Sequence, residues 1–128
     1  MPEKYFSLVD ELFEAIEDKR DVNQVRKLIK SGCDVNVQVE EDYTPLIAAA
    51  IVGSLEIVKL LVELGADVNM ITKYGDSPLY CAKSRNFQDI AEYLEPMTSA
   101  EIQAQVARDL NVELGLLKRK KKPFKSKQ

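Results

Sequence analysis

The chain has 128 residues, of which 45% are hydrophobic and 30% are charged, and its formal net charge is −3. These values are typical of a single globular domain, and they exclude a chain that is disordered throughout. Histidine is absent, which removes the commonest general base, a usual zinc site and any cysteine–histidine nucleophile pair. We therefore expect no enzymatic activity, no metal, no cofactor and no small-molecule substrate.

The charge is divided unevenly along the chain. Seven of the 18 basic residues lie in residues 118–128, where no acidic residue occurs. Residues 1–117 therefore carry 21 acidic residues against the remaining 11 basic ones, a net charge of −10. This division indicates an acidic folded body with a basic appendage. The sequence contains no run of about 18 apolar residues, which a membrane helix would need. Its first residues lack a signal-peptide pattern. We expect an intracellular, cytoplasmic protein, with a nuclear location also open.

The first block, residues 5–36, contains two apolar stripes at helical spacing that end before Gly32. Arg20 lies between the stripes, where the following block has Gly53. The spacing predicts two amphipathic helices with a turn between them. The stripes consist of Leu8, Leu12, Phe13 and Ile16, and of Val22, Val25, Leu28 and Ile29.

The second block, residues 37–69, is the most regular. Thr44 is a helix-capping residue, and Pro45 suits the first helical position, where an N–H would have no partner. Gly53 predicts a turn after Val52, and Gly65 predicts the end of a second helix. The expected helices carry Leu46, Ala49 and Ala50, and then Leu55, Val58, Leu61 and Val62.

Two motifs in these blocks recur at a distance of 33 residues. Gly32-Cys33-Asp34-Val35-Asn36 returns as Gly65-Ala66-Asp67-Val68-Asn69, and Thr44-Pro45-Leu46 returns as Ser77-Pro78-Leu79. The third block, residues 70–97, has Asn86 at the turn and ends at Pro96. This period, with Thr-Pro-Leu opening a helix and Gly-Ala-Asp-Val-Asn closing the block, resembles the ankyrin repeat. The resemblance implies an all-α solenoid of stacked helix-turn-helix units with short β-hairpin fingers.

An additional C-terminal helix is predicted over residues 98–117. Thr98-Ser99-Ala100-Glu101 has the form of a capping box. The helix either covers the open end of a repeat domain formed by residues 1–97 or docks onto a partner. Its apolar face is formed by Ile102, Val106, Leu110, Leu114 and Leu117.

The basic segment 118–128 cannot form a core, and we expect it to be disordered. It resembles a nuclear-localisation signal, and it would also suit nucleic acid or an acidic surface. Phosphate contacts from such a segment would give affinity without reading a base sequence. Its basic residues are Lys118, Arg119, Lys120, Lys121, Lys122, Lys125 and Lys127.

The ankyrin resemblance also implies where a partner binds, because that family usually uses the fingertips and the exposed side of the first helices. On the matching positions these are Gln38, Glu40, Glu41, Tyr43, Ile71, Lys73, Tyr74 and Asp76 in the fingers, and Glu14, Asp18, Ile47, Ile51, Tyr80 and Ser84 in the first helices. Tyrosines flanked by acidic residues favour a protein partner with a basic surface. Ile47 and Ile51 are equally consistent with packing between repeats.

The sequence therefore favours a non-catalytic protein-interaction module that acts as an adaptor, scaffold or inhibitor. The alternative is a nucleic-acid-associated or nuclear regulator that uses the basic C-terminal segment. Cys33 and Cys81 occupy positions of small residues in the repeat, and we expect both to be small buried hydrophobic residues.

Overall fold

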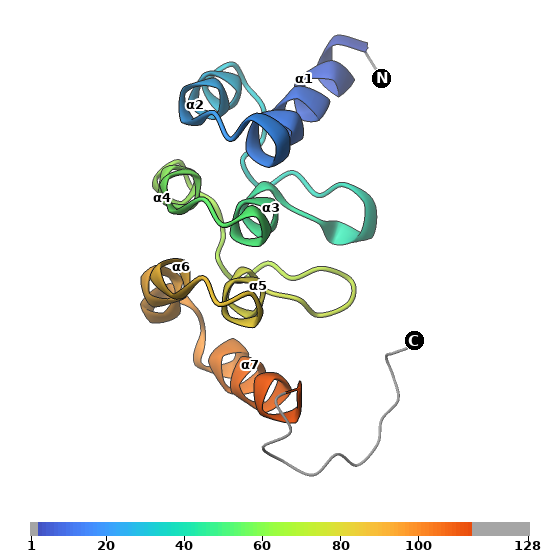
Figure 1. Ribbon diagram of the computed structural model, residues 1–128. Coiled ribbons are helices and arrows are strands. Elements are labelled where there is room, and N and C mark those ends of the chain that lie inside the picture. Colours follow the sequence, from blue (N-terminus) through green and yellow to red (C-terminus); the bar gives the residue numbers. More distant parts are fainter. Residues whose placement is uncertain (1–2, 114–128) are drawn as a thin grey trace.

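The computed structural model describes residues 3–113, with side chains described for residues 8–111. The helices of this part form two columns, and the loops between repeats project to one side (Figure 1). The fold is therefore all-helical. The first column contains α1 (Glu3–Glu14), α3 (Pro45–Val52) and α5 (Pro78–Ser84), the second contains α2 (Val22–Lys30), α4 (Leu55–Glu63) and α6 (Gln88–Leu94), and α7 (Ala100–Glu113) packs against α5.

The first helices of the second and third repeats begin in the same way. The Thr44 and Ser77 hydroxyls each accept a hydrogen bond from the backbone N–H three residues later, at 3.2 and 3.0 Å. Pro45 and Pro78 follow them and begin α3 and α5. These caps satisfy donors that have no partner within the helix. The predicted equivalence of the two helix starts, 33 residues apart, is confirmed.

The turn inside each repeat requires a left-handed backbone. Arg20, Gly53 and Asn86 have φ values of 51°, 84° and 64°, at the three positions where the sequence predicts the turns. At Gly53 a side chain would also collide, because an added Cβ would lie 2.7 Å from Cζ of Phe87. Glycine therefore serves two purposes at this turn: it allows the positive φ and admits the Phe87 ring.

The first helix of the first repeat differs from the other two. It continues beyond α1 as a π-helical turn, η1 (Ala15–Lys19). The carbonyl oxygen of Ala15 accepts from the N–H groups of both Arg20 and Asp21. The wider turn was not predicted, and it changes which side chains lie on the inner face of this helix.

A continuous core runs through the repeats. The two alanines Ala48 and Ala49 have no exposed surface, so α3 can lie between α1 and α5 at close range. Burial of a leucine side chain is worth ~1.5–3 kcal/mol. Cys33 and Cys81 are free and each 3% exposed, so the prediction that they are buried is confirmed. Fully buried residues from the predicted stripes include Leu12, Ile16, Val25, Leu46, Val58 and Leu61, and the third repeat adds Leu79, Ile90 and Leu94.

Asparagine side chains join successive repeats. Asn36 Nδ2 donates to the carbonyl oxygen of Gly65 at 3.1 Å, and Asn36 Oδ1 accepts from the N–H of Asp67 at 2.9 Å. One repeat later, Asn69 Oδ1 accepts from the N–H of Ser99 at 2.9 Å. The closing motif of the first and of the second repeat therefore attaches it to the element that follows.

The finger loops, residues 37–43 and 70–76, contain no β-strand within the described residues 3–113. The expected β-hairpins are replaced by turns because each loop has one closing backbone hydrogen bond instead of a ladder. Val39 N–H donates to Tyr43 O at 2.9 Å, and Thr72 N–H donates to Asp76 O at 3.0 Å. The two closures lie 33 residues apart, so the fingers are equivalent although neither forms strands.

The first finger contains a short 3₁₀ turn, η2 (Glu40–Asp42). Asp42, which replaces the glycine of the second finger, has a φ of 63°, and Glu41 has the same value. Two consecutive left-handed residues without glycine are strained. The Glu41 carbonyl oxygen accepts from the N–H of Lys73 at 2.9 Å, so the two fingers are joined at this turn.

The third repeat ends as the sequence predicts. The α-helix α6 stops at Leu94, and Pro96 lies in the 3₁₀ turn η3 (Glu95–Met97). Thr98 does not cap α7, because its hydroxyl donates to the Leu94 carbonyl oxygen at 2.8 Å. Ser99 accepts from the N–H of Ile102 instead, at 3.3 Å. The predicted capping box is therefore wrong by one residue.

Helix α7 contributes its apolar side to the core. Val106 is 3% exposed, and Ile102 and Leu110 pack against the core from the same side. Leu114 and Leu117 lie outside the described residues, as does the whole segment 118–128.

Candidate functional site

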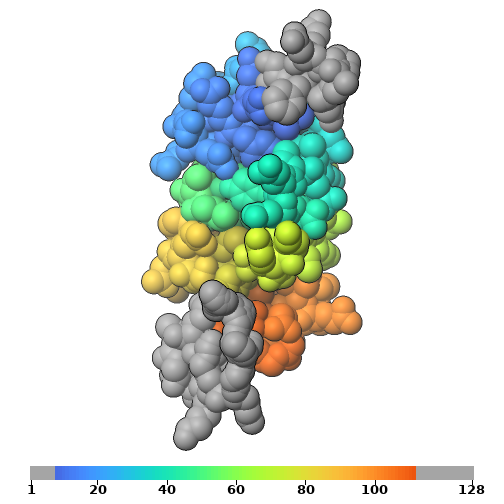
Figure 2. Space-filling view, turned by 90° about the vertical axis from the view of Figure 1, so that its right-hand side faces the viewer, coloured from blue at the N-terminus to red at the C-terminus, as the bar shows by residue number. Residues whose placement is uncertain are grey.

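A groove lies between the two finger loops and the column of first helices. We call it the finger groove, and its volume is about 450 Å³. Figure 2 faces the side from which the finger loops project, where the repeats follow one another in chain order. The groove is lined by Glu17, Val39, Glu40, Glu41, Tyr43, Ile47, Ile51, Thr72, Tyr74, Asp76 and Cys81.

Tyr43 forms the wall of the groove next to the first repeat. Its hydroxyl donates to Oε2 of Glu17 at 2.7 Å, and its ring stacks on Phe13 with centroids 5.6 Å apart. Burial raises the pKa of Tyr43 well above its ordinary value, and the hydrogen bond to Glu17 raises it further. The phenol is therefore neutral at physiological pH and holds the Glu17 carboxylate in place.

Tyr74 lies at the outer edge of the groove and is 65% exposed. Its hydroxyl donates to Oε2 of Glu41 at 2.9 Å, and this hydrogen bond raises the pKa of Tyr74. The ammonium of Lys73 lies 5.7 Å from the centroid of the ring. Tyr74 is thus a large, oriented aromatic surface that remains open to a partner.

The lining of the groove is acidic. It includes the four carboxylates of Glu17, Glu40, Glu41 and Asp76, and no lysine or arginine of the described residues lines it. A concave surface with one sign of charge attracts ligands of the opposite sign and raises their on-rate. The groove is therefore suited to cationic side chains.

Thr72 shapes the second finger from inside. Its hydroxyl oxygen accepts from the N–H groups of Tyr74 and Asp76, each at 3.2 Å, and the residue is 8% exposed. These bonds fix the two groove residues of that finger relative to each other. Val39 occupies the equivalent position in the first finger and has no side-chain oxygen to form them.

The floor of the groove is apolar. Ile47 has no exposed surface and packs with Ala50 and Cys81 beneath the cavity, while Ile51 is partly exposed. The Cys81 thiol is an unreactive part of this floor, because burial raises its pKa to about 12 and the thiolate is the nucleophile. Ile47 therefore packs between the repeats, which is one of the two roles that the sequence left open for it.

The structure brings about half of the expected contact residues together. Seven of them line the groove: Glu40, Glu41, Tyr43, Ile47, Ile51, Tyr74 and Asp76. Seven others do not line it: Glu14, Asp18, Gln38, Ile71, Lys73, Tyr80 and Ser84. Among these, Lys73 and Ile71 are exposed near the second fingertip, and Tyr80 is partly buried against the core.

Sequence reasoning missed Glu17, Val39, Thr72 and Cys81. Glu14 and Asp18 follow from the ankyrin resemblance as the positions that match Ile47 and Ile51, but Asp18 lies in the π-helical turn, and Glu17 lines the groove. The 33-residue register of Val39 with Thr72 is a signal that could have identified both finger positions.

Two absences apply to the described part of the chain alone. No group of three or more histidine, cysteine, aspartate or glutamate side chains there is arranged to hold a metal ion. Among the same residues, no helix has the length and apolarity needed to cross a membrane.

Several curated proteins are similar to this chain over the repeats. The Notch-regulated ankyrin repeat-containing protein A of Danio rerio is 34% identical over 87 residues, which is 65% of this chain and 78% of that protein. An ankyrin repeat-containing protein of Schizosaccharomyces pombe is 38% identical over 77 residues, and the chain spans only 36% of its length. The likeness thus extends over most of the relative in the first case and over about a third of it in the second.

The family described as "Ankyrin repeats (3 copies)" matches residues 12–105. This range begins at Leu12 in α1 and extends into α7. It includes both finger loops and every residue that lines the groove. The chain therefore belongs to the ankyrin repeat family.

Proposed function

We propose that this ankyrin-repeat interaction module binds a partner protein with a basic surface through the finger groove. In this proposal it acts without catalysis, as an adaptor, scaffold or inhibitor. The observation that carries it is the lining of four carboxylates with no lysine or arginine among the described residues. The exposed ring of Tyr74 beside this lining supports the same proposal, because tyrosines at such positions contribute strongly to binding.

The parts of the chain have different roles in this proposal. The repeats in residues 1–97 hold the recognition surface, and the helix expected over 98–117 covers the last repeat. A basic side chain entering the groove would meet Glu41 and Asp76 from the two fingers, and its aliphatic stem would contact the partly exposed Ile51. Such stems pack against apolar surface while the charged end stays near the carboxylates.

The test uses a fluorescent nona-arginine peptide and two matched double variants. Glu40→Gln with Glu41→Gln removes two charges from the groove and keeps an oxygen that can accept from Tyr74. Glu56→Gln with Glu63→Gln removes the same charge from exposed positions of α4. Binding is measured by fluorescence anisotropy at 0.15 M salt, where long-range charge effects are largely screened.

We expect the groove variant to weaken peptide binding about tenfold or more, because each charge-assisted contact is worth ~1 kcal/mol. The α4 variant is expected to change it less than about twofold. Equal losses in the two variants would show that the peptide responds to net charge and not to the groove, and the proposal would fail. Tyr74→Ala is expected to weaken binding further while leaving the thermal unfolding temperature nearly unchanged.

The alternative role, a nucleic-acid-associated or nuclear regulator, is supported by the seven basic residues of segment 118–128. Its signature would be an affinity for single-stranded DNA that falls steeply with salt and disappears when these residues are changed to glutamine. Binding that survives the change would exclude this role for the segment.

A further inference from the structure

No lysine or arginine among the described residues lines the finger groove. Two described basic residues lie close to groove residues: the ammonium of Lys73 is 5.7 Å from the Tyr74 ring centroid, and the positive charge of Arg85 lowers the pKa of Tyr43 against the larger effect of burial. Neither lines the cavity between Glu17 and Asp76. Carboxylates concentrated in this way gain stability when a positively charged segment approaches them.

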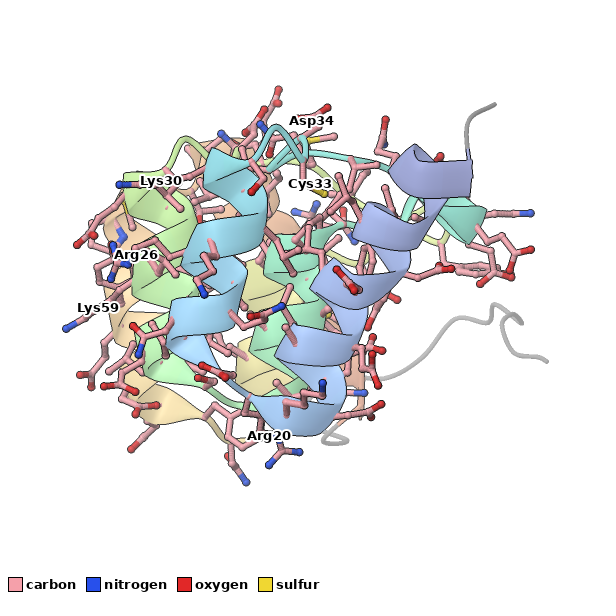
Figure 3. The ribbon with its side chains drawn as sticks, turned by 90° about the horizontal axis from the view of Figure 1, so that it is seen from above. Arg20, Arg26, Lys30, Cys33, Asp34 and Lys59 are labelled. Atoms are coloured by element: carbon pink, nitrogen blue, oxygen red, sulfur yellow. The ribbon has the colours of Figure 1, made fainter. Side chains whose placement is uncertain are left out.

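The opposite side of the molecule has mixed charge. Figure 3 shows Arg26, Lys30 and Lys59 on the second helices, away from the finger loops. Exposed glutamates, Glu56 and Glu63, lie on the same helix as Lys59. A basic segment would meet both signs of charge there, whereas the groove lining offers it only carboxylates.

The chain itself carries a complementary segment. Residues 118–127 include all seven basic residues of the C-terminal part and no acidic residue. The last described helix, α7, ends at Glu113 and packs against α5, and Cys81 of α5 forms part of the groove floor. Lys127 lies fourteen positions after Glu113, and an extended chain of that length spans up to ~46 Å. The segment is therefore long enough to reach the groove from the neighbouring helix.

We propose that the basic segment 118–127 docks in the finger groove of its own chain and competes there with a basic partner. This inference rests on the proposed function in one respect: both assume that the groove accepts cationic side chains. A tethered segment has an effective concentration in the millimolar range. A partner must therefore displace it, and the contact weakens as salt screens the charges.

The docking is tested by paramagnetic broadening in the full-length chain. A spin label is attached through Ser126→Cys. The buried thiols of Cys33 and Cys81, whose pKa values are raised by burial, react slowly, and mass spectrometry verifies a single label. We expect the amide signals of Glu41 and Tyr74 to lose more than half of their intensity, while those of Arg26 and Lys59 keep theirs. The broadening should disappear at 0.5 M NaCl.

A version of the segment with five of its seven positive charges removed provides the control. Changing Lys118, Arg119, Lys120, Lys121 and Lys122 to glutamine in the labelled chain should remove the broadening at the groove. Broadening that persists after this change, that is equal on the two sides of the molecule, or that is absent throughout would overturn the proposal. Broadening seen only when unlabelled ¹⁵N chains are mixed with labelled chains would assign the contact to a second copy and would also overturn it.

Competition separates this inference from the proposed function. The glutamine version of the segment should bind the nona-arginine peptide about five- to tenfold more tightly than the natural chain. Equal affinities would refute docking of the segment and leave the groove as a peptide site. A peptide that binds neither chain would refute the proposed function, and the broadening measurement would still decide whether the segment docks.

Discussion

Gly53 offers a sharp test of the packing between the second and third repeats, because its contact Phe87 precedes α6 of the third repeat. The substitution Gly53→Ala places a Cβ at a residue with a φ of 84°, 2.7 Å from Cζ and 2.9 Å from Cε1 and Cε2 of Phe87. Gly75→Ala is a matched control, because Gly75 has a φ of 89° and no heavy atom within 4 Å of an added Cβ. Both substitutions force an alanine into a left-handed backbone conformation, but only Gly53→Ala also brings a Cβ into collision with the Phe87 ring.

The left-handed conformation costs an alanine ~1–2 kcal/mol. Overpacking against a ring in the fold adds ~1–3 kcal/mol. We therefore expect Gly75→Ala to lower the free energy of unfolding by ~1–2 kcal/mol and Gly53→Ala to lower it by ~2–5 kcal/mol. The whole free energy of unfolding of a domain of this size is roughly 5–15 kcal/mol, so Gly53→Ala should remove a large part of the stability.

Urea unfolding followed by far-ultraviolet circular dichroism measures both values. In a Phe87→Ala background, the cost of Gly53→Ala should fall to that of Gly75→Ala, because the ring is gone. If Gly53→Ala and Gly75→Ala cost the same in the natural chain, the collision with Phe87 does not determine the choice of glycine. A cost of Gly53→Ala that is unchanged by removing Phe87 would lead to the same conclusion.

Three further predictions concern the hydrogen bonds and the thiols. Asn36→Ala should lower the free energy of unfolding by ~1–2 kcal/mol in urea titrations, because two hydrogen bonds to the next repeat are lost at an exposed site; no change would remove its joining role. Tyr43→Phe should lower the free energy of unfolding by ~1–2 kcal/mol at pH 7, because the hydrogen bond from the Tyr43 hydroxyl to Glu17 is lost. The folded-state pKa of Tyr43 is raised, so its contribution is complete below the unfolded value of about 10 and decreases as the pH rises above it; a cost that grows with pH would contradict this. Cys33 and Cys81 should resist a thiol reagent at pH 8 and react fully in denaturant, because burial raises the pKa of both, and rapid reaction of the native chain would refute their burial.

Much of the fold follows from local chemistry that is visible in the sequence. Thr44 and Ser77 cap their helices, and Gly53 and Asn86 provide left-handed turns, because these side chains satisfy backbone requirements within a few residues. The 33-residue period then fixes how the repeats correspond. Such features need no knowledge of distant contacts, so the pattern is sufficient to place them.

The errors arise where distant contacts decide between similar local choices. Both Thr98 and Ser99 can cap α7, and Ser99 does so while its N–H bonds to Asn69 from the preceding repeat. The π-helical turn places Glu17 in the groove by widening one turn of the first repeat. Neither of these choices is visible in the periodicity.

The Asn69–Ser99 hydrogen bond attaches α7 to the repeats in the place where a fourth repeat would begin. The side-chain oxygen of Asn36 accepts a hydrogen bond from the following repeat, at Asp67. The equivalent oxygen of Asn69 accepts one from Ser99, at the start of α7, which is not a repeat helix. A fourth repeat inserted after residue 97 would have to take over that amide and expel Val106 from the core. A design that lengthens the solenoid at its C-terminal end would therefore have to remove α7 first. A repeat inserted ahead of the third repeat would leave the contacts of α7 unchanged.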